Sequence, residues 1–215
     1  METFALDAAF GRATASCAET LSGIAELDPT LRERAHLQPQ FRQALRAELG
    51  HSVLVKEVTI PLSNWDGNPA KGGPGGVDVV VVQAESSWAA LAELKWVGDW
   101  ETFAWCVFDA LKMASARRSD LAMRCYVVAG APRAIWKAST SSGTMLIDGE
   151  HDVASVVERY DGKGAVFSEA VAWPTALPAR IETTVAADAP VTTAQAPWKL
   201  KCVRIEPLGS EALPC

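Results

Sequence analysis

Apolar side chains recur along the first 130 residues with two different spacings. Stretches with helical spacing predict helices, and stretches rich in β-branched residues predict four strands. In chain order the predicted elements are a helix at residues 1–28, a second helical stretch that begins there, a helix at 40–49, strands at 53–60, 77–82 and 89–96, a helix at 100–116 and a strand at 123–129. This order predicts an α/β fold with a mixed central sheet flanked by helices.

Glycine and proline set the expected limits of these elements. The first helix is expected to be interrupted near Gly23. Pro39 suits the first turn of a new helix, because its missing N–H would have no partner there, and Gly50 supplies the stop. Residues 61–76 are so rich in glycine and proline that they predict a loop.

The pattern weakens after residue 130. Short helices are expected at residues 133–138 and 152–159, and strands at 179–187 and 198–206. No internal repeat or low-complexity linker divides the chain. We therefore expect one domain over residues 1–215, with a core at about 38–130 and a C-terminal, β-containing elaboration at about 131–215.

Two of the predicted helices carry charged residues whose helix face bears on a possible site. Glu48 falls on the same stripe as Phe41 and Leu45, which places a carboxylate on the buried side of its helix. In the helix at 100–116, Asp109 and Lys112 fall on the arc opposite the apolar residues and are expected on its polar side.

Composition narrows the classes of function. The 215 residues carry a formal net charge of −6, which argues against broad affinity for nucleic acid. Local basic strips remain open, since arginines crowd residues 32–46 and 117–118, although solvated helix faces explain both clusters. The five cysteines show no disulfide or zinc spacing. Neither a basic, apolar leader nor a membrane-spanning run is present, so we expect a cytoplasmic protein without membrane contact.

Three ionisable residues lie where a sheet interior is expected. Asp78 begins the apolar strand at 77–82, and Glu93 precedes Lys95 by two positions on the next strand. Glu93 and Lys95 therefore project from one face, and the short turn makes the strand with Asp78 the expected hairpin partner. Charges in a core are costly, so the pattern favours a shared polar site over a surface ion pair.

This arrangement resembles the PD-(D/E)XK nuclease superfamily, whose restriction-endonuclease-like core has the same αβββαβ order. The resemblance rests on Asp78 and on the triplet from Glu93 to Lys95. It implies a catalytic set of Asp78, Glu93, Lys95 and Glu48. Many members carry an acid on the first core helix, where Glu48 is the match and Glu57 a rival. Some carry a polar residue on the next helix, where Lys112 or Asp109 would match.

The resemblance also implies a reaction. Asp78 and Glu93 would bind Mg²⁺ or Mn²⁺ together with the Leu94 carbonyl and waters, and Glu48 would hold a second metal or a metal-bound water. Lys95 would orient the attacking water and stabilise charge on the phosphate. The implied function is a metal-dependent nuclease that hydrolyses phosphodiester bonds in DNA or RNA.

Two alternatives stay open at the level of sequence. A catalytically inactive nuclease-like module could bind a protein partner in a defence or repair assembly, in keeping with the acidic net charge. Lys95 could also simply pair Glu93 inside a structural protein. A homodimer remains compatible with the sequence.

Overall fold

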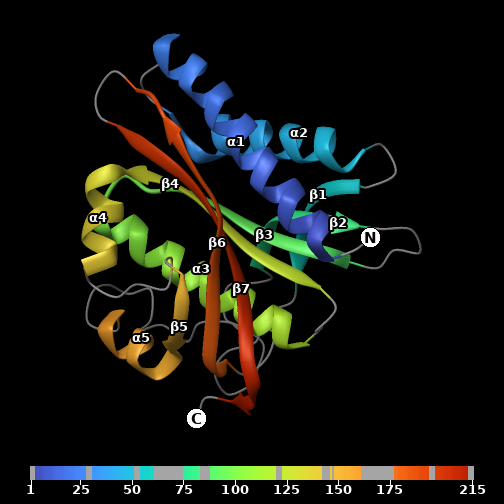
Figure 1. Cartoon of the computed structure of the whole chain (residues 1–215), viewed down its shortest axis with the longest axis vertical. Helices are drawn as coiled ribbons and strands as arrows, with labels where there is room; N and C mark the ends of the chain where they lie inside the picture. Colours follow the sequence, from blue (N-terminus) through green and yellow to red (C-terminus); the bar gives the residue numbers. More distant parts are fainter. Residues whose placement is uncertain are drawn as a thin grey trace.

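A seven-stranded mixed sheet with helices on both faces forms the body of the protein (Figure 1). A computed structural model describes residues 3–27, 31–50, 54–60, 75–82, 88–119, 123–141, 146, 148–160, 177–193 and 197–212. The predicted α/β class, with a mixed sheet flanked by helices, is confirmed. Of the loop predicted at residues 61–76, residues 61–74 lie outside the described part, and the last two belong to a strand.

Among the described residues, three helical segments come first, three strands follow, and helix and strand then alternate up to the final pair of strands. The helices are α1 (Thr3–Leu27), the π-helical turn η1 (Glu33–Leu37), α2 (Gln38–Leu49), α3 (Trp100–Ser119), α4 (Arg133–Ser141) and α5 (Val153–Tyr160). The strands are β1 (Leu54–Ile60), β2 (Gly75–Val82), β3 (Trp88–Trp96), β4 (Arg124–Pro132), β5 (Gly149–Asp152), β6 (Pro178–Val191) and β7 (Trp198–Ala212).

The strand order is β1-β2-β3-β4-β7-β6-β5. Strands β1, β2 and β3 form an antiparallel meander, and α3 then connects β3 to β4, which lies parallel to it. The long hairpin of β6 and β7 pairs with β4 through β7. The C-terminal strands thus continue the main sheet, and the predicted elaboration is part of one structure.

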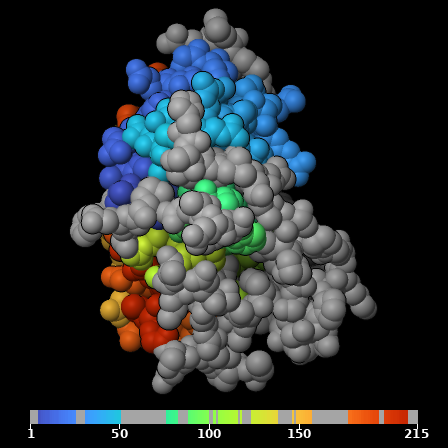
Figure 2. Space-filling view, turned by 90° about the vertical axis from the view of Figure 1, so that its right-hand side faces the viewer, coloured from blue at the N-terminus to red at the C-terminus, as the bar shows by residue number. Residues whose placement is uncertain are grey.

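Two hydrophobic cores lie on opposite faces of this sheet. On β3, Ala92 and Leu94 face the core beneath α1 and α2, whereas Leu91 faces the core formed with α3. Phe41 in the core with α2 and Phe103 in the core with α3 are both fully buried. Seen from the side of β1 and β2, the blue-to-cyan N-terminal helices lie above the green strand residues (Figure 2). The sheet is therefore a buried middle layer, and charges on it need partners.

The N-terminal helices differ from their prediction in two ways. Helix α1 continues through Gly23, because one glycine in a helix costs only about 1 kcal/mol and the buried Leu21 and Ala25 hold both sides of it. Pro39 lies in the first turn of α2, as predicted, but α2 begins at Gln38 and follows directly on η1.

Candidate functional site

Strands β2 and β3 separate partway along their length. Their pairing ends at Val79 and Ala92, although both strands continue. Beyond this point β2 stays with β1, and β3 pairs with β4 from Ala90 to Trp96. The result is a fork in the sheet, with Asp78 on one arm and Glu93 and Lys95 on the other.

Carboxylates satisfy the backbone of β3 inside the fork. The Leu94 N–H donates to Asp78 Oδ2 at 2.9 Å, and the Trp96 N–H donates to Glu33 Oε2 at 3.1 Å. A buried N–H without a partner is costly, so these two side chains replace the missing strand. Asp78 and Glu33 are thereby fixed at the open end of the meander.

Helix α2 holds Asp78 from the other side. Gln38 Nε2 donates to Asp78 Oδ1 at 2.8 Å, and Arg42 Nε donates to the Asp78 carbonyl at 3.0 Å. Both oxygens of the Asp78 carboxylate therefore accept a hydrogen bond. Its position depends on helix and strand together.

Glu93 and Lys95 face helix α3, as the alternation of β3 predicts. The Lys112 ammonium forms an ion pair with Glu93 Oε1 and donates to the Gly76 carbonyl at 3.0 Å. Lys95 Nζ lies 3.3 Å from Asp109 Oδ2 and 3.8 Å from Glu33. Lys95 thus pairs with the acids of α3 and η1, and Lys112 takes the place beside Glu93.

Six side chains share this fork, and we call them the fork cluster: Glu33, Asp78, Glu93, Lys95, Asp109 and Lys112. Four carboxylates face two ammonium groups, and Arg42 adds one guanidinium at the edge. Glu93, Asp109 and Lys112 are only 4%, 6% and 6% exposed. An excess of negative charge is therefore held in a nearly dry site.

The pKa values reflect this crowding. Burial, followed by repulsion from Asp109, raises the pKa of Glu93 well above its ordinary value. Burial likewise raises the pKa of Asp109 and of Glu33. Burial alone would lower the pKa of Lys95, but Asp109 and Glu33 outweigh it and raise this pKa, so Lys95 stays charged.

Nucleophilic thiol chemistry does not fit this site. Cys106 lies one turn before Asp109 on α3 and is fully buried. Burial raises the pKa of its thiol further from neutrality. The thiolate, which is the reactive form, is therefore absent at neutral pH.

Glu48 does not join the fork cluster, contrary to its predicted place among the catalytic and metal-binding residues. Its Oε2 accepts a hydrogen bond from Arg12 Nε of α1 at 2.6 Å. Gln38, ten residues earlier and roughly 15 Å away along the helix, is the α2 residue that contacts Asp78. The helix face that carries Phe41 and Leu45 is buried at those residues but only half-buried at Glu48. The side chain of the rival Glu57 lies outside the described part.

Asp109 and Lys112, the α3 residues that the resemblance matched to the site, both lie at the fork, although their place on the polar arc did not predict burial. Both residues are buried. The amphipathic pattern fails here because their partners, Lys95 and Glu93, are themselves polar. Glu33 was not among the predicted site residues. Its signal was a carboxylate directly before the first core helix, which the assumed start at Pro39 concealed.

The donors of the fork cluster match the needs of a hard cation in part. Glu93 Oε1 and Asp109 Oδ2 are buried and accept no well-aligned hydrogen bond, although each meets a lysine as an ion pair. Oxygen donors with excess negative charge are what Mg²⁺ or Mn²⁺ requires. Within the described residues, however, no three His, Cys, Asp or Glu side chains are grouped closely enough to hold a metal. A cation at Glu93 would have to displace the Lys112 ammonium.

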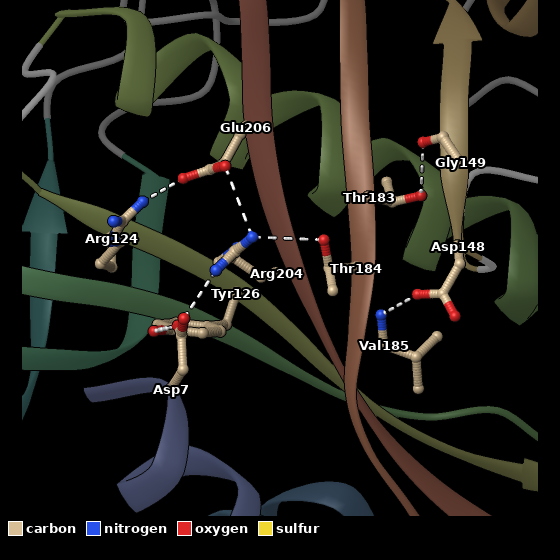
Figure 3. Close-up of polar contacts among 10 residues, drawn as sticks. All are labelled: Asp7, Arg124, Tyr126, Asp148, Gly149, Thr183, Thr184, Val185, Arg204 and Glu206. Carbon is tan, nitrogen blue, oxygen red and sulfur yellow. Dashed lines mark hydrogen bonds and ion pairs between the residues drawn. The ribbon is translucent and has the colours of Figure 1, made fainter. Parts of the chain in front are cut away.

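A second polar network lies on the face with α1 and is built differently (Figure 3). Asp7 accepts hydrogen bonds from Tyr126 Oη and Arg204 Nη1, each at 2.6 Å. Glu206 pairs with Arg204 at 3.6 Å and also with Arg124. Burial and then Asp7 raise the pKa of Tyr126, so its hydroxyl remains a neutral donor. The charges of the two acids, Asp7 and Glu206, balance those of Arg124 and Arg204. This indicates that the network holds α1 against the sheet.

Comparisons with known proteins add no constraint to this geometry. No family model, curated protein or solved structure matches the chain. None of the described helices has the length and apolar character needed to cross a membrane. Function must therefore be argued from the site itself.

Proposed function

We propose that the protein is a metal-dependent nuclease of the restriction-endonuclease-like type, with the fork cluster as its active site. The observation that carries this proposal is the meeting of Asp78, Glu93 and Lys95 at the point where β2 and β3 part. The order α2, β1, β2, β3, α3, β4, with β3 and β4 parallel, supports the same reading. Fold alone does not determine function, so the charges carry the argument.

Each residue has a chemical role that follows from its surroundings. Asp78 and Glu93 would hold a divalent cation, which would polarise the phosphodiester and lower the pKa of the attacking water. Lys95 remains protonated between Asp109 and Glu33 and can donate to a phosphate oxygen. Gln38 and the Leu94 N–H fix the Asp78 carboxylate in place. Preorganised charges of this kind stabilise the negative transition state of phosphoryl transfer.

One observation favours a second candidate function. The Lys112 ammonium is already bound by Glu93 and by the Gly76 carbonyl, which are oxygens that a metal would use. A site neutralised in this way fits an inactive nuclease-like module that binds a partner. The two candidates differ in whether a divalent cation can replace Lys112.

Thermal unfolding with Mn²⁺ separates them, since a ligand that binds the native state raises Tm. We expect Mn²⁺ to raise the Tm of the wild type and of Glu48→Gln, but not of Asp78→Asn. Glu48→Gln is the matched control, because it also removes one carboxylate. That carboxylate belongs to an exposed ion pair with Arg12 and not to the fork cluster. Cleavage of single- and double-stranded DNA and of RNA is then followed in Mn²⁺, where Asp78→Asn and Lys95→Ala should each abolish the activity.

The outcomes are distinct. A Mn²⁺ shift that survives in Asp78→Asn, or cleavage that survives in both variants, contradicts the proposed site. No Mn²⁺ shift in the wild type favours the inactive module.

A further inference from the structure

A basic hollow of about 560 Å³ lies between α4 and the start of β7. Arg133 and Lys137 line it from α4, and Lys199 and Lys201 line it from β7. Trp136 and Ala134 complete the lining. The chain as a whole has a net charge of −6, so four basic side chains around one hollow differ strongly from the charge of the rest of the protein.

The lysines from β7 are held in place. Lys199 Nζ lies 2.8 Å and Lys201 Nζ 3.6 Å from Asp188 of β6. The Lys201 ammonium also lies 4.9 Å from the centre of the Trp136 ring, and the residue is only 9% exposed. A lysine buried to this degree is costly. Asp188 offsets part of the charge of these two lysines.

Helix α4 adds to this field. It begins at Arg133, and its first turn contains no acidic residue. The free N–H groups at a helix N-terminus carry partial positive charge and favour anions. The Arg133 N–H itself donates to the Pro197 carbonyl, which ties the start of α4 to the start of β7. The hollow therefore combines a fixed helix end with side-chain cations.

The hollow opens on the same face of the sheet as Lys95. In the register of the strands, Lys95 pairs with Ala129 of β4, and Ala129 pairs with Lys201 of β7. Lys95 and Lys201 are thus two strands apart, or roughly 10 Å. At an axial rise of about 3.4 Å per nucleotide, this gap spans roughly three nucleotides of one strand.

We propose that this hollow binds the sugar-phosphate backbone of a nucleic-acid strand, a few nucleotides from the fork cluster. The link to the fork cluster rests on the proposed nuclease function, whereas binding itself requires no catalysis. Arg133 and Lys137 are exposed and would meet the phosphates directly. Lys201 would supply a fixed charge behind them.

Fluorescence anisotropy with labelled 20-nucleotide DNA and RNA strands tests the proposal. EDTA is present throughout, so that no metal-dependent cleavage interferes. The variant Arg133→Ala/Lys137→Ala removes two exposed cations of the hollow. A protein that loses two phosphate contacts should show a salt slope smaller by about 1.4, since each contact on a single strand contributes about 0.7.

The matched control is Arg12→Ala/Arg180→Ala, which also removes two exposed arginines. Arg12 lies on α1, across the sheet, and Arg180 lies on β6 eight residues before Asp188, roughly 26 Å along the strand. We expect wild-type affinity in this control and at least a tenfold loss in the hollow variant at low salt.

The proposal is overturned if the wild type fails to bind either strand at low salt, or if the hollow variant and the control bind equally. Asp78→Asn separates this proposal from the nuclease function. Binding that persists in Asp78→Asn supports the hollow. If the wild type binds but shows no cleavage in Mn²⁺, the hollow stands and the nuclease proposal fails.

Discussion

The ion pair of Lys112 with Glu93 offers the sharpest test of the fork cluster. Both side chains are nearly buried, at 6% and 4% exposure, and Lys112 also donates to the Gly76 carbonyl. Removal of one partner from a buried pair leaves an uncompensated charge and costs about 3–5 kcal/mol. We expect Lys112→Met, which keeps the length of the side chain, to lower the free energy of unfolding by this amount.

A double-mutant cycle isolates the pair itself. Glu93→Gln leaves the Lys112 ammonium with only the Gly76 carbonyl, whereas Lys112→Met/Glu93→Gln removes both charges. The double variant should be more stable than the sum of the single losses by about 2–3 kcal/mol, the upper range for residues in contact. Urea unfolding at a pH above the raised pKa of Glu93, where both partners are charged, gives all four free energies. If Lys112→Met costs less than about 1 kcal/mol and the two losses add, the pair does not exist in solution as described.

The same variant also reports on metal uptake. Without the ammonium, Glu93 is free for a cation, so Mn²⁺ should bind Lys112→Met more tightly than the wild type. At 100 times its Kd, Mn²⁺ would restore about 2.7 kcal/mol of the lost stability. A variant that is destabilised but gains nothing from Mn²⁺ would count against metal binding at Glu93.

Two further outcomes follow from the contacts around the fork. Gly130→Ala should lower the free energy of unfolding, measured with urea, by about 2–4 kcal/mol. The new Cβ would lie 2.3 Å from the Trp96 ring, which is stacked on Trp198 with ring centres 4.5 Å apart. Gly98→Ala is the control and should be near neutral, because a Cβ there would have no atom within 4 Å. The raised pKa of Glu93 means that the native state holds a proton that the unfolded state releases, so wild-type stability should fall, relative to Glu93→Gln, as pH rises from about 4.5 through this raised pKa. A parallel pH profile for the two proteins would refute this reading of Glu93.

The strands of the meander and β4 were accessible from sequence because β-branched runs and proline or glycine limits agree there. Val79, Val81 and their neighbours alternate between two buried cores, which requires apolar residues on both faces. Asp78 and Glu93 stood out for the same reason, since each interrupts such a run. The sequence pattern thus located the polar site, because charged residues in a buried strand are energetically costly.

The burial of these residues' partners was not accessible from sequence. The resemblance pointed to Lys112 or Asp109 on α3, but hydrophobic periodicity placed both on a polar arc, which gave no sign that they are buried. Glu33 lies in the turn η1 directly before α2, and no motif in that turn marks it as a site residue. The basic hollow gathers residues of α4 and β7 that are far apart in the chain, so no run of basic residues in the sequence marks it.

Metal binding and apo stability compete for the same oxygens at the fork. The Lys112 ammonium uses Glu93 and the Gly76 carbonyl, and any cation bound there must first release it. The cost of that release is bounded by the stability that Lys112 provides. A large loss in Lys112→Met therefore implies weak metal affinity in the wild type, and a ligand that draws Lys112 away would strengthen it. Under the proposed nuclease function, the phosphate of a nucleic-acid strand would carry the charge to do so, which would couple substrate binding to assembly of the metal site.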